Sequence, residues 1–276
     1  MNIVELAKLR KLFGGSSGGG SAEEEWFDDG NTHIWISLPE GRTSPMLGVS
    51  VDGTVTVDWG DGTTPDVLTG TSVYTAAYTP NHNYASAGEY VITLTVAGDM
   101  NLLGDNASPI ASCLLRHSKS TDKRNRGYAS AIKKIEIGNN VSYIRDYAFH
   151  QCYALTSIRN PVGTGWFVYS QCYGLKNVSI SANQSSIGYG LLLSCYTLTN
   201  INIPKNITSI SGNAFSDCFS LTKIRFERTT PPVVSSSDAF TGVPTDCIIS
   251  VPIGCLDAYK SATNYPNPNT YTYVEE

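Results

Sequence analysis

The second half of this 276-residue chain repeats a cysteine at nearly constant spacing. The cysteines lie 20, 23 and 23 residues apart, at Cys152, Cys172, Cys195 and Cys218. Each is followed three residues later by leucine and preceded three residues earlier by a bulky apolar residue. A unit this short cannot bury an apolar face by itself, so successive units must stack on one another. The spacing therefore predicts a solenoid.

Positions within each repeat predict one short strand per coil. An aliphatic residue stands six positions after each cysteine, and most coils carry a second apolar residue two positions later. The first of these positions holds Ile158, Val178, Ile201 and Ile224. A fifth, degenerate coil follows at residues 239–251, where Val243 takes the place of the cysteine. We expect about five coils.

The consensus of these coils, IxxxAFxxCxxLxxIxIP, resembles the BspA-type leucine-rich repeat over about residues 132–254. That family occurs in many bacterial and protist surface proteins and in some phage proteins. The resemblance implies a last strand near Val251 and a capping segment with a short helix in residues 255–276. The second coil departs from the pattern, because it is three residues short and has Val168-Tyr169 in place of Ala-Phe.

The seven cysteines are expected to remain thiols. Stacked coils keep the β-carbons of neighbouring inward side chains about 4.8 Å apart, whereas a disulfide needs about 3.8 Å. The four repeated cysteines are therefore assigned a structural role as small apolar core residues. A disulfide between Cys247 and Cys255 is left open. No CxxC or paired Cys/His spacing indicates zinc, and we expect neither a metal site nor a cofactor.

Residues 32–98 hold several segments of alternating apolar residues between Gly, Pro and Asp turns, which predicts strands with one buried face. A charged fraction of only 16% also suits a β-rich chain. Three motifs here, WGDG, HNY and GEYVITLTV, resemble the PKD family of immunoglobulin-like domains. The resemblance implies a β-sandwich. The resemblance also assigns structural roles in this sandwich to Trp59, Asp61, Tyr84 and Tyr90.

The acidic turn of this region could suggest calcium, because Asp58, Asp61 and Asp66 are carboxylates at short intervals. A D-x-x-D sequence is more often a turn held by its own side chains, and the longer ligand series of a calcium loop is missing. Calcium binding is therefore left open, with the turn as the favoured interpretation.

No catalytic pattern is visible in the sequence. The chain lacks a phosphate loop, a dinucleotide-binding glycine motif and a zinc-helix motif, and none of its histidines has a nucleophile in a recognisable pattern. We expect a non-enzymatic protein. Tyr153, Tyr173 and Tyr196, directly after the repeated cysteines, are candidate contacts for sugar or protein, with packing between coils as the alternative.

The N-terminus is predicted to form an amphipathic helix over residues 1–13, followed by a Gly/Ser and acidic linker over residues 14–31. The apolar stripe of the helix consists of Ile3, Leu6, Leu9, Leu12 and Phe13. Charges between the apolar residues argue against a secretory signal. A helix this short is marginal in water, so we expect it to dock on another protein, with a frayed terminus as the alternative.

Residues 99–131 form a basic junction in a chain whose formal net charge is −5. Its candidate anion-binding residues are Lys119, Lys123, Arg124 and Arg126. One interpretation is a site for an anionic glycan, and the other is a solvated loop at the entrance of the solenoid. The net negative charge gives no reason to expect nucleic acid, and no run of about 18 apolar residues predicts insertion into a membrane.

Together these segments predict a mainly β protein: a docking helix and tether, a PKD/Ig-like β-sandwich at residues 32–98, a basic junction, a leucine-rich-repeat solenoid and a C-terminal cap. The order resembles a phage virion accessory protein, either a capsid decoration protein or a head-fibre adhesin. Such a protein docks on capsid or tail proteins and binds a host cell-surface glycan or protein. The alternative is a BspA-type adhesin of the bacterial cell surface. Head or tail location, receptor, copy number and homo-oligomerisation are left open.

Overall fold

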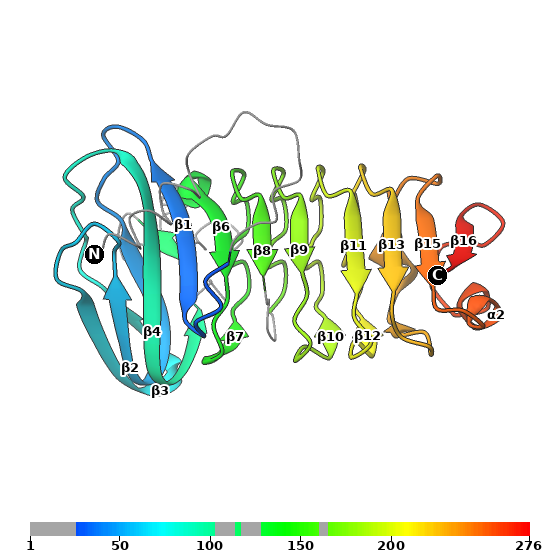
Figure 1. Ribbon diagram of the computed structural model, residues 1–276, viewed down its shortest axis with the longest axis horizontal. Coiled ribbons are helices and arrows are strands. Elements are labelled where there is room, and N and C mark those ends of the chain that lie inside the picture. Colours follow the sequence, from blue (N-terminus) through cyan, green and yellow to red (C-terminus); the bar gives the residue numbers. More distant parts are fainter. Residues whose placement is uncertain (1–25, 103–113, 117–127, 160–164) are drawn as a thin grey trace.

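The computed structural model describes residues 26–102, 114–116, 128–159 and 165–276. The molecule is elongated, with long strands at one end that lead into a stack of coils and a short helix at the other end (Figure 1). Among the described residues, α-helix is confined to the five-residue α2 (Leu256–Lys260). The helices described there are all too short or too polar to span a membrane. The prediction of a mainly β chain is confirmed.

Four long strands form the N-terminal end. They are β1 (Thr32–Leu38), β2 (Met46–Asp58), β3 (Asp66–Tyr78) and β4 (Gly88–Leu102). β2 pairs antiparallel with β3 on one edge and with β4 on the other, and β1 pairs with the first half of β4. Ile34 and Ile92 are opposite each other and fully buried in the core. The next pair, His33 and Thr93, faces the other side of the sheet because successive side chains alternate.

Strand β1 also joins this end to the coils. Its second edge pairs antiparallel with β6 (Ile132–Glu136), so one sheet runs in the order β3-β2-β4-β1-β6-β8-β9. Strands β5 (Leu115–Arg116) and β7 (Val141–Ile144) add to β2 and to the end of β4. The predicted separate sandwich at residues 32–98 is not confirmed, because hydrogen bonds place its strands and those of the first coils in a single sheet.

The coils stack in parallel, as the repeat predicts. The strands that follow β6 on one face are β8 (Ser157–Arg159), β9 (Asn177–Ser179), β11 (Asn200–Ile203), β13 (Lys223–Phe226), β15 (Ile248–Val251) and β16 (Thr272–Glu275). A second row contains β10 (Ser186–Ile187), β12 (Ser209–Ile210) and β14 (Val233–Val234) (Figure 1). Two 3-10 helices complete the elements, η1 (Ala129–Ala131) and η2 (Ser237–Phe240).

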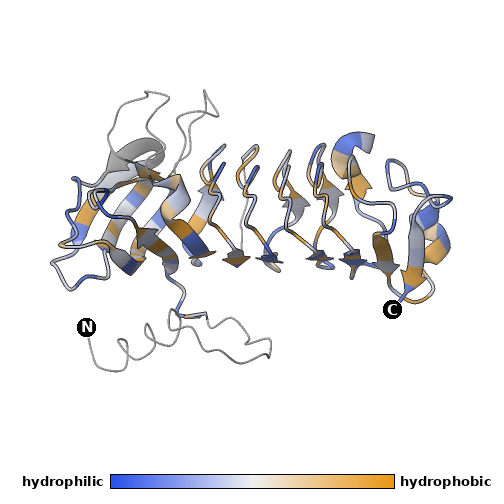
Figure 2. Cartoon of the chain, turned by 90° about the horizontal axis from the view of Figure 1, so that it is seen from above, coloured by the Kyte–Doolittle hydropathy of each residue, from blue (hydrophilic) through white to orange (hydrophobic). Residues whose placement is uncertain are grey.

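Register confirms that equivalent repeat positions lie opposite one another. Ile201 pairs with Ile224, and Ile224 pairs with Ile249, so the strand residues identified from their distance to the cysteine form one row. Hydrophobic segments recur from coil to coil along the stack (Figure 2). The predicted solenoid is therefore confirmed.

Each of the four repeated cysteines is preceded by a residue in the left-handed backbone region, and none of these four residues is glycine. They are Gln151, Gln171, Ser194 and Asp217, with φ between 57° and 59°. Each donates its backbone N–H to a carbonyl of the next coil, for example Gln171 to Leu193 at 2.7 Å and Ser194 to Ser216 at 2.8 Å. Left-handed backbone is costly away from glycine, and these hydrogen bonds between coils offset that cost.

The repeated cysteines point inward as buried thiols, as predicted. Three of them donate to a carbonyl of the preceding coil, as in the contact of Cys172 Sγ with the Phe149 carbonyl oxygen at 3.2 Å. Burial raises the pKa of the Cys218 thiol to about 12. Cys247 and Cys255 are also free thiols, so the disulfide left open between them is absent. Cys113 lies outside the described residues.

The C-terminal segment closes the stack with α2 and β16, in line with the capping segment that the repeat family implies. Strand β16 extends the sheet by pairing parallel with β15. Tyrosine hydroxyls fasten the segment to earlier coils, because Tyr259 donates to the carbonyl of Arg228 at 2.6 Å and Tyr271 donates to that of Val243 at 2.8 Å. These bonds hold a polar outer face over the last apolar coil.

Candidate functional site

A row of exposed aromatic rings runs along the solenoid at the position directly after each cysteine. We call it the outer aromatic row, and it consists of Tyr153, Tyr173, Tyr196 and Phe219. The turn at this point sends the cysteine side chain into the core and the next side chain into solvent. Ring centroids are 5.1, 4.6 and 5.3 Å apart along the row. The spacing of the coils therefore places one ring above the next.

Stacking decides which part of each ring a partner can reach. Neighbouring planes differ by only 5° to 25°, so the faces of the inner rings are covered by their neighbours. Relative exposure is still 45% for Tyr153, 38% for Tyr196 and 54% for Phe219. Burial, reinforced by the adjacent Tyr196 and Tyr153, raises the pKa of the Tyr173 phenol. The row therefore presents mainly ring edges and tyrosine hydroxyl groups.

Next to the far end of the row the chain has a glycine. A β-carbon built at Gly242 would lie 3.0 Å from Cε1 of Phe219, and the residue has a φ of +77°. Both observations favour glycine at this turn. Because Gly242 has no side chain, the Phe219 ring can lie close to its backbone.

A second exposed aromatic group lies on the outer arc of the second and third coils. Trp166 is 61% exposed, and its ring centroid lies 6.1 Å from that of Tyr189. Phe167 stacks on Tyr147 at 5.3 Å and contacts Tyr189 edge-on at the same distance. These rings are tilted and perpendicular rather than uniformly parallel, so they form a patch and not a continued row.

The aromatic residues of the PKD-like motifs form a compact cluster in the N-terminal sheet. Trp59 is buried and stacks on His82 with centroids 4.6 Å apart. Tyr84 donates its hydroxyl to the Trp59 carbonyl at 2.9 Å, and its own ring contacts that of Tyr90 at 4.1 Å. Asp61 holds the far edge of the His82 ring through a 2.8 Å contact with Nε2. The geometry is that of a packed corner, consistent with the structural roles proposed from the motifs.

The aspartates considered as calcium ligands instead accept hydrogen bonds from other groups of the protein. Asp61 accepts from Thr63 and His82, Asp66 accepts from the Trp59 indole, and Asp58 accepts from the Gly60 N–H. Burial opposes ionisation of Asp61, but the bonds from Thr63 and His82 outweigh it and lower the pKa of this carboxyl group. In the described part of the chain, no three metal-ligating side chains come together.

Two predicted sites lie outside the described residues. The docking stripe Ile3, Leu6, Leu9, Leu12 and Phe13 falls within residues 1–25, and the cationic side chains Lys119, Lys123, Arg124 and Arg126 fall within residues 117–127. Both stay predictions.

Parallel coils that repeat an inward cysteine and a row of paired short strands define the class of this structure as a leucine-rich-repeat solenoid. Residues 126–243 match the family described as BspA type Leucine rich repeat region, in six copies where the sequence suggests about five coils. Residues 126–243 therefore form a BspA-type leucine-rich repeat region. A search of curated proteins gives no match for this chain.

Three solved structures are similar to part of the chain. A leucine rich cell surface protein of Faecalibacterium prausnitzii is 19% identical over 63% of this chain and 40% of that one, with a TM-score of 0.46. A leucine-rich repeat protein of Bacteroides ovatus is 21% identical over 52% and 42%, with a TM-score of 0.38. The pneumococcal vaccine antigen PcpA is 14% identical over 66% and 47%, with a TM-score of 0.39. The matched part spans less than half of each of these proteins.

Sequence reasoning identified three members of the outer aromatic row and missed the fourth. Phe219 follows Cys218 as Tyr153 follows Cys152, so the repeat position alone is enough to find it. Trp166 was also missed, and no periodic signal marks it, because its coil is the shortened one.

Proposed function

We propose that this protein is a non-enzymatic adhesin of the bacterial cell-surface type that binds a protein partner through the outer aromatic row. The observation that carries the proposal is the continuous stack of four aromatic rings on four successive coils, three of them 38% to 54% exposed. Tyrosine is among the residues that contribute most to protein interfaces, whereas an exposed apolar row contributes little to folding.

The geometry of the row favours a protein over a sugar as its partner. A sugar ring binds an aromatic side chain through the flat face of that side chain, and here the inner faces are already covered by neighbouring rings. Ring edges and hydroxyls instead form a narrow ridge along the solenoid. A protein groove can bury such a ridge, and the hydroxyls of Tyr153 and Tyr196 can then bond to backbone groups of the partner.

The row is preorganised for binding. Tyr173 and Tyr196 are each held between two rings and the end rings each stack on one, so little side-chain entropy remains to be lost when a partner covers the row. The coils beneath the row are fixed by hydrogen bonds between strands, as in the Ile201 to Ile224 pair. A rigid base with a repeated contact suits an extended interface.

The repeat family favours the cell surface over the virion as the location. BspA-type repeats occur in many surface proteins, and residues 126–243 match them. Assembly on a virion was inferred from residues 1–13, which lie outside the described residues, and it stays a prediction.

The proposal is tested by adhesion of protein-coated beads to epithelial and bacterial cells, with and without protease treatment of the cells. In the test variant, Tyr153, Tyr173, Tyr196 and Phe219 are all replaced by serine. We expect protease-sensitive binding by the wild type and a loss of at least about 30-fold in affinity for the variant, equivalent to one hot spot of about 2 kcal/mol.

A matched control removes exposed apolar surface elsewhere on the solenoid. Val233 and Ile253 are 71% and 79% exposed, so the Val233→Ser, Ile253→Ser double variant tests whether any apolar loss reduces adhesion. It should bind like the wild type. Adhesion that resists protease, or that is equally weak in both variants, would contradict the proposal.

A further inference from the structure

A cavity of about 460 Å³ opens on the face of the N-terminal sheet opposite its core. Its walls come from residues 27–31, from the turn after β2 and from the paired strands β1 and β4. Its lining includes Phe27, Asp29, His33, Asp58, Val91 and Thr93. The volume lies within the range of pockets that hold small ligands.

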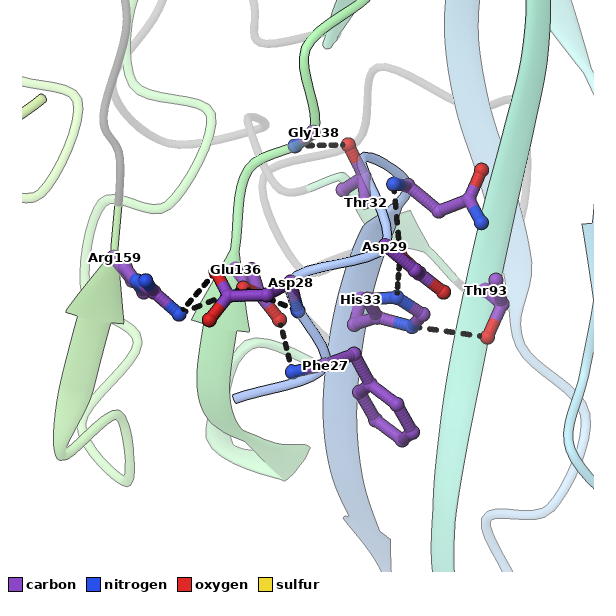
Figure 3. Close-up of polar contacts among 10 residues, drawn as sticks. Phe27, Asp28, Asp29, Thr32, His33, Thr93, Glu136, Gly138 and Arg159 are labelled. Atoms are coloured by element: carbon purple, nitrogen blue, oxygen red, sulfur yellow. Dashed lines mark hydrogen bonds and ion pairs between the residues drawn. The ribbon is translucent and has the colours of Figure 1, made fainter. Parts of the chain in front are cut away.

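The wall formed by residues 27–31 is held in place by charged groups beyond the cavity. Glu136 accepts the backbone N–H of Phe27 at 2.9 Å, and Asp28 forms a 2.7 Å ion pair with Arg159 (Figure 3). The Phe27 ring stacks on His33 with centroids 4.2 Å apart. The segment therefore has a fixed position over the sheet before any ligand arrives.

At the floor of the cavity, a histidine links a carboxylate to a hydroxyl. His33 is 2% exposed, with Nε2 2.8 Å from Asp29 Oδ1 and Nδ1 3.1 Å from Thr93 Oγ1 (Figure 3). Burial opposes ionisation of Asp29, but the hydrogen bond from His33 outweighs it and the pKa of the carboxyl group is lowered. A carboxylate only accepts, so Nε2 of His33 donates to Asp29. The Thr93 hydroxyl has two acceptor lone pairs, so at least one of them stays available to a ligand.

The remaining polar groups of the cavity combine acceptors with groups that both donate and accept. Asp58 accepts from the Gly60 N–H through Oδ1, and its Oδ2 has no hydrogen-bond partner among the described residues. Asn31 and Thr63 add an amide and a hydroxyl group. Ligand hydroxyls match such a lining because each can donate and accept.

The charge and the apolar surface of the cavity lining further restrict the class of ligand that fits. The described residues that line the cavity include Asp29 and Asp58 but no lysine or arginine, so an acidic ligand is disfavoured. Phe27, Pro65 and Val91 supply apolar surface for carbon–hydrogen groups. The same described residues bring together no trio of metal-ligating side chains, so an organic ligand fits better than a metal ion.

From these observations we infer that the cavity binds one non-acidic sugar unit, whose hydroxyls bond to Asp58, Asn31 and Thr93 while its carbon–hydrogen face packs on Phe27. This site is separate from the outer aromatic row and does not depend on the function proposed for that row. The protein then has a sugar pocket at one end and a protein-binding ridge along the coils.

The test is saturation-transfer NMR on the full chain with the methyl glycosides of glucose, galactose, mannose and N-acetylglucosamine, with glucuronic acid as the acidic probe. We expect transfer to at least one neutral glycoside and none to glucuronic acid. Amide shifts in ¹⁵N-labelled wild-type protein should change at Gly60 and Thr93, which locates the sugar without any substitution.

Two variants complete the test. Asp58→Asn keeps an acceptor for the Gly60 N–H, and Thr93→Val keeps the side-chain shape, so each should weaken sugar binding by about tenfold or more without unfolding the sheet. Asp246→Asn, at an exposed position in the last coils, is the matched control and should bind normally. Absence of transfer to all four glycosides, equal transfer to glucuronic acid, or shifts confined to the solenoid would overturn the inference. Loss of the outer aromatic row should leave sugar binding unchanged.

Discussion

Two aromatic rows run along the same solenoid and differ in the side of the turn on which they lie. The inner row stands three residues before each repeated cysteine and contains Phe149, Tyr169 and Phe215, with Leu192 in the third coil, all fully buried. The outer row stands one residue after each cysteine and is exposed. Both have stacked rings, with 5.3 Å between Phe149 and Tyr169 inside and 4.6 Å between Tyr173 and Tyr196 outside. The repeat period therefore sets the ring stacking in both rows, whereas burial determines which row stabilises the fold.

The largest expected difference between the rows is in the cost of losing a ring. Phe215 and Phe219 belong to the same coil, one buried and the other 54% exposed. Phe215→Ala should lower the free energy of unfolding by about 3 to 5 kcal/mol, because it leaves a cavity between coils. Phe219→Ala should lower it by less than about 1 kcal/mol. Urea unfolding of both variants measures the difference, and equal losses would show that the rows do not differ in this way.

A second effect, which depends on pH, is expected from the thiols beside the inner row. Burial raises the pKa of Cys218 from an ordinary value of 9.0 to about 12. The folded state disfavours the thiolate of Cys218, so the free energy of unfolding does not depend on this group below pH 9, where the thiol is protonated in both states. As the pH rises from 9 toward 12, only the unfolded state loses the proton, and the free energy of unfolding falls by about 1.4 kcal/mol per pH unit.

Thiol reactivity tests whether these cysteines are buried in the folded protein. At pH 8, a disulfide reagent should label the buried cysteines only after unfolding in urea. Rapid labelling of Cys218 in the folded protein would show that the inner side of the coil is open to solvent.

The smallest difference concerns one hydroxyl. The buried hydroxyl of Tyr169 has no hydrogen-bond partner among the described residues, and this tyrosine stands where the repeat consensus has phenylalanine. Tyr169→Phe should therefore raise the free energy of unfolding by about 1 kcal/mol, since it removes an unpaired buried polar group. Tyr173→Phe in the outer row is the control and should change stability by less than about 0.5 kcal/mol. A loss of stability in Tyr169→Phe would mean that its hydroxyl has a partner in solution.

The solenoid could be predicted from the sequence because its information is local and repeated. One cysteine, one leucine three residues later and one aliphatic residue six positions after the cysteine define four of the coils, and the register of Ile201 with Ile224 follows from stacking them. The thiol state followed from the coil spacing. The C-terminal helix followed from the family resemblance.

Other features depend on contacts between residues far apart in the chain, which no local pattern encodes. Alternation in β1 predicts a strand but not that its second edge pairs with β6, about 100 residues later. Left-handed backbone at Gln151 and Gln171 was also unpredictable, since neither residue is glycine. The sugar cavity needs Phe27, Asp58 and Thr93, which only the folded sheet brings together.

The most direct test of the account is the affinity of the outer-row variant, with Tyr153, Tyr173, Tyr196 and Phe219 replaced by serine, measured together with its stability. We expect the variant to unfold cooperatively in urea, and to bind protease-sensitive cell-surface sites more weakly than the wild type by at least about 30-fold. Unchanged adhesion with a folded variant would contradict it, because the exposed rings would then have no part in binding.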